Sequence, residues 1–126
     1  MNHLLLPTLR EQTQNHCSYC DFHPPRRNDK TIDHFKPKGK APYYHLAYHW
    51  ENLYFCCGHC QMCRGEQYND LLLRPDEAGF QFGVFFIYNY KTGEIEVNPS
   101  LPDELEQRAK QTIKLFGLNE EGHPIK

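Results

Sequence analysis

Two Cys-x-x-Cys pairs constrain the fold of this chain more than any other feature: Cys17 with Cys20, and Cys57 with Cys60. A tetrahedral structural zinc takes four thiolates, which commonly come from two such short-spaced pairs. The thirty-six residues between the pairs form a wide gap, but the entropic cost of closing a loop grows only slowly with its length. The sequence therefore predicts a four-cysteine zinc site that joins two distant segments.

The remaining cysteines and nearby histidines leave alternatives to this ligand set. Cys56 and Cys63 are predicted to be packed thiols. Cys56 directly precedes Cys57, however, so the ligand at this position could be either of these two cysteines. Three histidines lie close enough in sequence to replace a cysteine: His16, His23 and His59. Any of them would give a less regular set, so the four-cysteine site is the preferred interpretation.

The size of the chain favours one domain over residues 1–126, with a core small enough to benefit from a bound metal. No apolar stretch approaches the length of a membrane span. The segment from Met1 to Pro7 lacks the pattern of a secretory signal. Six cysteines without an export signal indicate metal binding in the reducing cytoplasm rather than disulfides.

The charge of the chain is unevenly distributed. A net charge of −2 argues against a free-standing nucleic-acid binder. One segment, however, carries six basic residues against the two acidic residues Asp29 and Asp33; the basic residues are Arg26, Arg27, Lys30, Lys36, Lys38 and Lys40. We expect this segment to be able to hold phosphate. From Thr92 onward acidic residues predominate, which fits either a solvated face or a partner-binding surface.

Local patterns predict an α+β fold. A helix is expected over Thr8 to Asn15, a loop over Phe22 to Asn28, and a short helix after the second cysteine pair. Strands are expected over Thr31 to Phe35 and Asn52 to Phe55, and a β-hairpin from Phe82 to Tyr90 and Glu94 to Val97. A capping motif at Ser100 to Asp103 and a stop at Gly117 predict a C-terminal helix.

An aromatic stretch follows the basic segment. Five side chains here are predicted to pack in the core, with base stacking as the alternative: Tyr43, Tyr44, Tyr48, Trp50 and Tyr54. The two histidines of the same stretch, His45 and His49, are alternative metal ligands.

The dipeptide Asp33-His34 lies between the two cysteine pairs. Hydrolysis of a phosphodiester needs a base to deprotonate water, a cation to offset transition-state charge, and stabilisation of the departing oxygen. A histidine is suited to the first task because it can be neutral and basic at cell pH. Adjacent strand residues point to opposite faces, so we expect a bulge or a curved ribbon to bring both side chains to one phosphate.

These features together resemble the HNH endonucleases. The motifs that carry the resemblance are Asp33-His34-Phe35-x-Pro37, Trp50-x-Asn52-Leu53 and Cys57-x-x-Cys60-Gln61-x-x-Arg64-Gly65. Further segments up to Asn119 make the chain most similar to the HNH subunit of Septu and retron-associated anti-phage systems. The resemblance implies a small zinc-stapled ββα-metal (His-Me finger) core over about 17–66, with a β-hairpin and C-terminal helix extension over about 70–119.

The resemblance also implies roles for individual residues. Asp33 would be the first ligand of a catalytic Mg²⁺ or Mn²⁺ ion, His34 the general base, and Asn52 the residue that fixes the loop and orients the His34 ring. Gln61 stands where the family has a His or Asn ligand, which is a departure from its pattern; an amide oxygen with a carboxylate suits a hard cation. The implied phosphate contacts are Lys36, Lys38 and Arg64.

The implied function is a metal-dependent endonuclease that cuts nucleic acid, with DNA favoured over RNA. By resemblance it would be the effector of a Septu-like defence system and work with an ABC-type or SMC-like ATPase. An alternative is a zinc-stapled adaptor that binds nucleic acid or a partner with little or no catalysis. A further alternative is a zinc-ribbon structural subunit without nucleic-acid contact.

Overall fold

The computed structural model of the chain describes residues 2–22 and 30–120. Within them the elements follow this order: α1 Asn2–Gln12, β1 Lys30–His34, the 3-10 helices η2 Tyr43–Leu46 and η3 Trp50–Asn52, β2 Leu53–Cys57, α2 Gly58–Arg64, α3 Phe82–Phe85, β3 Phe86–Asn89, β4 Glu94–Val97 and α4 Asp103–Leu115. The predicted α+β class is confirmed. Most of the predicted loop, with Arg26 and Arg27, lies outside the described residues.

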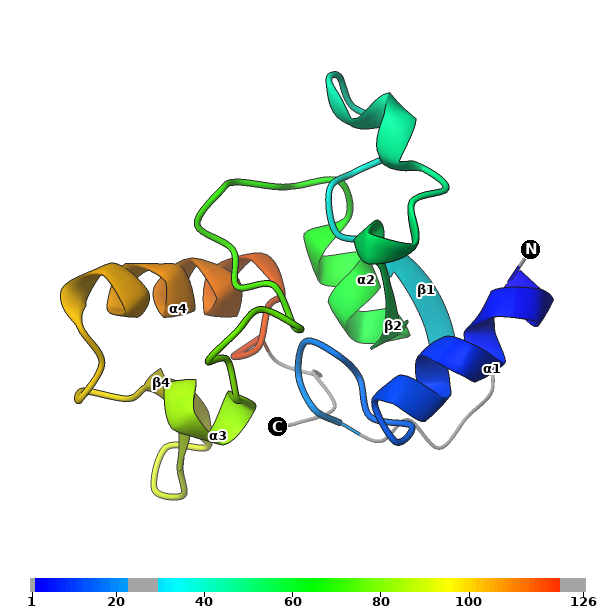
Figure 1. Cartoon of the computed structure of the whole chain (residues 1–126). Helices are drawn as coiled ribbons and strands as arrows, with labels where there is room; N and C mark the ends of the chain where they lie inside the picture. The colour runs from blue at the N-terminus through cyan, green and yellow to red at the C-terminus, as the bar shows by residue number, and fades with distance from the viewer. Residues whose placement is uncertain (1, 23–29, 121–126) are drawn as a thin grey trace.

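The first group of elements is a two-stranded antiparallel sheet with a helix on each side (Figure 1). Strands β1 and β2 pair residue by residue, from Lys30 opposite Cys57 to His34 opposite Leu53. Every residue of β2 is buried. Its Leu53 and Phe55 pack with α1, while Tyr54 and the cysteines face the main core. The sheet is therefore covered on both faces, and α2 follows β2 without a loop.

The second group consists of the β3–β4 hairpin and helix α4 (Figure 1). Its core contains Phe86, Ile95 and Ala109. The side chain of Asn119 holds the backbone of Ile95, accepting from its N–H at 2.6 Å and donating to its carbonyl at 2.9 Å. After α4 the chain returns to the first group, because Phe116 joins the core that contains the cysteines.

Several predicted element boundaries shift. The N-terminal helix spans Asn2–Gln12 rather than Thr8 to Asn15, and it ends early because Gln14 and Asn15 adopt left-handed backbone angles. Strand β1 lies one residue earlier than predicted, and β2 runs from Leu53 to Cys57. The expected hairpin begins at Phe86, since residues 82–85 form the single turn α3 with the Gln81 carbonyl accepting from the N–H groups of Val84 and Phe85. The predicted Ser100 cap is also absent, and α4 starts directly after Pro102.

The aromatic stretch differs from its prediction. Tyr54 is buried as expected, but Tyr44, Tyr48 and Trp50 are exposed and η2 contains no buried residue. The reason is geometric: two 3-10 helices of three and four residues present too little surface to cover a core.

The end of α4 has the hydrogen bonds of a Schellman motif. Leu118 N–H donates to the Ile113 carbonyl at 3.1 Å, and Gly117 N–H donates to the Lys114 carbonyl at 3.3 Å. Gly117 has φ of +61°, and a Cβ there would lie 2.8 Å from Cys63 Sγ. The predicted stop at Gly117 is therefore confirmed, with both a backbone and a packing reason for glycine.

We predict that Gly117→Ala lowers the free energy of unfolding by more than the roughly 1–2 kcal/mol that a left-handed alanine costs. Gly79→Ala is the matched control, since Gly79 has φ of +82° and open space around its Cα. Urea denaturation of both variants measures the difference. Equal losses would contradict a role for the Cys63 contact.

Candidate functional site

The sulfur atoms of the four predicted cysteines converge. Cys17, Cys20, Cys57 and Cys60 are all buried, and their Sγ atoms lie within 4.8 Å of one another. The first pair sits in a turn held to β2 by a 2.9 Å hydrogen bond from Ser18 N–H to the Phe55 carbonyl. The second pair spans the junction of β2 and α2, where Cys60 N–H donates to Cys57 Sγ at 3.5 Å.

The donor set fits a structural metal such as zinc. Hydrogen bonds among the four sulfur atoms lower the pKa of the Cys57 thiol and raise the pKa of the Cys20 and Cys60 thiols, so the four groups titrate together. Among the side chains that the structure describes, no other His, Cys, Asp and Glu residues converge in a group of three. This leaves Cys56 and Cys63 outside the cluster, together with His16 and His59. His23 lies outside the described residues.

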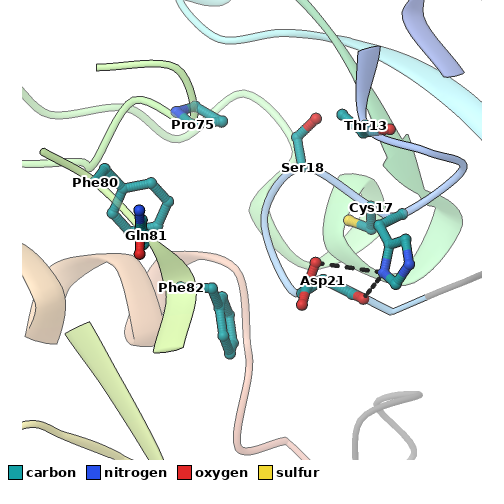
Figure 2. Close-up of a pocket in the computed structure, with 9 residues that line it drawn as sticks. Thr13, Cys17, Ser18, Asp21, Pro75, Phe80, Gln81 and Phe82 are labelled. Atoms are coloured by element: carbon teal, nitrogen blue, oxygen red, sulfur yellow. Dashed lines mark hydrogen bonds and ion pairs between the residues drawn. The ribbon is translucent and has the colours of Figure 1, made fainter. Parts of the chain in front are cut away.

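A hollow lies beside the first cysteine pair (Figure 2). His16 Nδ1 contacts the Asp21 carbonyl at 2.7 Å and Asp21 Oδ1 at 3.4 Å, which closes the turn around Cys20. The hollow has a volume of about 220 Å³ and is lined on its far side by residues of the 75–82 segment. None of the predicted catalytic residues lines it, so it is separate from the second site described next.

Asp33 is buried and carries an ion pair with Arg64 on α2. Tyr19, between the two cysteines of the first pair, donates its hydroxyl to Asp33 Oδ2 at 2.7 Å. Arg64 contacts the same Oδ2 atom, whereas Oδ1 has no hydrogen bond to any described residue. Burial raises the pKa of the Asp33 carboxyl, and the adjacent Arg64 and Tyr19 oppose that rise. The carboxylate is thus held in one orientation.

Arg64, which was expected to contact phosphate, is buried in the structure. Its side chain is 1% exposed. Besides Asp33, the guanidinium donates to the carbonyls of Phe35 at 2.7 Å, His34 at 2.8 Å and Gln67 at 3.1 Å. These hydrogen bonds hold the guanidinium inside the protein. The centre of the Phe116 ring lies 5.2 Å from Cζ of Arg64. Arg64 therefore balances a buried carboxylate instead of facing a ligand.

His34 ends β1, and its ring is oriented by a backbone carbonyl. Nε2 lies 2.8 Å from the oxygen of Ala47. A carbonyl oxygen only accepts, so Nε2 must carry the proton. In the neutral ring Nδ1 is then the unprotonated nitrogen, which is the form required of a base. No bulge interrupts the β1–β2 ladder, so the first of the two expected alternatives, a bulge or a curved ribbon, is absent.

Asn52 joins the two ends of the loop that holds the His34 ring. Its Oδ1 accepts from Lys36 N–H at 2.8 Å, and its Nδ2 donates to the Lys36 carbonyl at 3.0 Å and the Leu46 carbonyl at 3.3 Å. Leu46 directly precedes Ala47, whose carbonyl accepts from His34. Buried Asn52 thereby positions the acceptor of the His34 ring.

A second hollow, of about 210 Å³, brings most of the predicted catalytic residues together. Its lining residues are Asp33, His34, Pro37, Lys38, Gln61, Gly65 and Glu66. Both members of the Asp-His pair reach it despite the regular ladder, since β1 ends at His34. Gln61 Nε2 donates to the Ile32 carbonyl at 3.0 Å, so its nitrogen is fixed against β1 and its oxygen is turned away from that carbonyl.

The predicted lysines occupy two different places. Lys38 is exposed and lines the hollow. Lys36 is half-buried, with Nζ 5.7 Å from the centre of the Tyr43 ring. Sequence reasoning missed Tyr19 and Glu66, because nothing in the spacing of the motifs relates either residue to the Asp-His pair.

Comparisons with protein-family models, with curated proteins and with solved structures give no match. Among the described residues, no helix has both the length and the apolar character needed to cross a membrane. Functional inference for this chain therefore depends on its motifs and on the geometry of the two sites.

We predict that the purified chain contains one bound zinc, and that Cys20→Ser loses it and unfolds. Structural zinc binds with roughly 10–16 kcal/mol, as much as the whole stability of a typical domain at about 5–15 kcal/mol. Cys63→Ser is the control, since that thiol lies outside the cluster. Elemental analysis and circular dichroism measure the outcome. Retention of zinc by Cys20→Ser would refute the assignment.

We predict that Arg64→Met destabilises the zinc-loaded protein by about 3–5 kcal/mol, because it leaves the Asp33 carboxylate buried without a cation. Adding Asp33→Asn should recover part of this loss, since the second change removes the unpaired charge. Urea denaturation of the wild type, both single variants and the double variant gives the coupling energy. Additive losses would contradict the buried ion pair.

Proposed function

We propose that the chain is a metal-dependent endonuclease of the HNH type, with the hollow at the end of β1 as its active site. The observation that carries the proposal is the 2.8 Å hydrogen bond from His34 Nε2 to the Ala47 carbonyl. It leaves Nδ1 of a neutral ring to act as the base, in a hollow shared with Asp33 and Gln61. The chain order β1, β2, α2 further supports a ββα core that carries these residues.

In this proposal His34 Nδ1 removes a proton from the attacking water. Asn52 keeps the ring aimed by holding the Leu46 carbonyl, one residue before Ala47. Water attacks the phosphorus atom as the bond to the departing sugar oxygen breaks. Lys38 at the edge of the hollow attracts the phosphate.

Asp33 and Gln61 are the residues that would hold a divalent cation. Oδ1 of Asp33 and Oε1 of Gln61 are hard oxygen donors. The other polar atom of each side chain, Oδ2 of Asp33 and Nε2 of Gln61, already has a hydrogen-bond partner in the protein. Such donors suit Mg²⁺ or Mn²⁺. Once bound, the ion would supply charge stabilisation for the transition state and for the departing oxygen. Tyr19 and Arg64 contribute by keeping Asp33 in place.

The zinc-stapled adaptor differs from this proposal in lacking catalysis. Burial of Arg64 and the Glu66 carboxylate beside the hollow reduce its attraction for phosphate, which favours an adaptor that binds a protein partner. The resemblance to Septu subunits adds a defence role and an ATPase partner to the nuclease proposal. Such a partner would supply part of the affinity for nucleic acid that a chain of net charge −2 lacks.

We predict that His34→Ala lowers cleavage of plasmid or oligonucleotide in Mg²⁺ or Mn²⁺ by about 10²–10⁴-fold, the contribution of a general base. Tyr90→Ala is the control, because Tyr90 is 90% exposed beside the β3–β4 hairpin and does not line the hollow. Gel assays measure cleavage, and zinc content and circular dichroism report folding.

Equal activity of wild type and His34→Ala would refute the nuclease. Salt-sensitive binding without any cleavage would instead support the adaptor. Absence of both would support a structural subunit.

A further inference from the structure

Two exposed tyrosines lie on the loop that holds the His34 ring. Tyr44 is 62% exposed and Tyr48 is 78% exposed, more than the intermediate burial that is typical of tyrosine. His45 and His49 are also exposed and lie beside each other, with ring centroids 6.1 Å apart. We define the aromatic loop as residues 43–49. It projects from the rest of the molecule (Figure 1), in keeping with the exposure of the Tyr44 and Tyr48 rings.

The charge next to the aromatic loop is positive. Residues 34–50 contain three lysines and no Asp or Glu. Lys38 and Lys40 are exposed, and Lys36 Nζ lies 5.7 Å from the Tyr43 ring centre. The Tyr43 N–H donates to the Lys40 carbonyl at 2.8 Å, which ties the lysines to the start of the loop. Acidic residues border this segment: Asp33 precedes His34 and Glu51 follows Trp50. The Glu66 carboxylate lies against Gly39, between Lys38 and Lys40, and offsets part of their charge.

The aromatic loop is structurally tied to the hollow. The Ala47 carbonyl accepts from His34, and Lys38 lines the hollow. A chain of phosphates held by the lysines would therefore pass from the hollow to the tyrosines. Trp50 does not belong to this surface, because it lines another hollow that also contains Glu51 and Asp76.

We infer that the aromatic loop binds the unpaired bases of single-stranded nucleic acid while the lysines hold its backbone, with Tyr44 and Tyr48 as the stacking rings. The inference rests on the proposed nuclease function and specifies its substrate class. Exposed rings combined with cations are the usual means of binding single strands without sequence preference, since every base has a flat face. Paired bases are stacked inside a duplex and offer no such face to a side chain.

Binding of fluorescein-labelled oligothymidylate to the full zinc-loaded chain, without added divalent ion, tests this inference. An abasic strand with the same number of phosphates and a duplex of equal length are the comparison probes. We expect Tyr44→Ala/Tyr48→Ala to weaken oligothymidylate binding by roughly 5- to 150-fold for each base that is unstacked. Abasic binding should stay unchanged, and Tyr44→Phe/Tyr48→Phe should retain the wild-type affinity.

Tyr90→Ala is the matched control, because Tyr90 is 90% exposed on the β3–β4 hairpin, away from the aromatic loop. The inference is overturned if the double alanine variant keeps its affinity or Tyr90→Ala loses as much. It is also overturned if the wild type binds the abasic strand or the duplex equally well, or binds nothing, as a protein-docking surface would.

The two proposals fail separately. Cleavage that depends on His34 with unchanged binding by the double alanine variant refutes only the stacking surface. Base-dependent binding without cleavage supports the stacking surface and refutes only the nuclease.

Discussion

The convergence of four buried sulfur atoms is the constraint on which the rest of this structure depends. It brings the turn at 17–20 against the junction of β2 and α2, although thirty-six residues separate the two cysteine pairs. Tyr19 lies inside that turn and donates to Asp33. A metal bound by the thiolates would therefore hold more than the scaffold, because the position of the carboxylate at the second site depends on the same turn.

The Asp33–Arg64 pair links the metal cluster to the candidate active site. Both groups are buried, so separating them would leave an unpaired charge in a medium of low dielectric. Arg64 also holds the backbone at His34 and Phe35 and lies against Phe116, from the segment that follows α4. One guanidinium thus connects β1, α2 and the C-terminal part, which explains why an arginine inside a sequence motif is unavailable to a ligand.

In the candidate active site the His34 ring is held by a hydrogen bond, and the loop next to it carries mostly positive charge. His34 and Asn52 are organised by backbone carbonyls, which gives the ring one orientation before any ligand binds. Preorganisation of this kind is where catalytic sites gain most of their advantage. The exposed tyrosines and lysines on the same loop extend this surface outward, and they are the groups that the proposed single strand would contact.

The sequence by itself determined the α+β class, the hairpin, the stop at Gly117 and the four cysteines that converge, because turn residues and ligand spacing act locally or through one strong chemical preference. It also singled out the Asp-His pair and Gln61, which line one hollow. Only the tertiary structure decided that Arg64 is buried, that Tyr19 holds Asp33 and that Tyr44 and Tyr48 face outward. Burial and hydrogen-bond partners depend on segments distant in sequence, and a motif carries no information about which groups those segments bring against it.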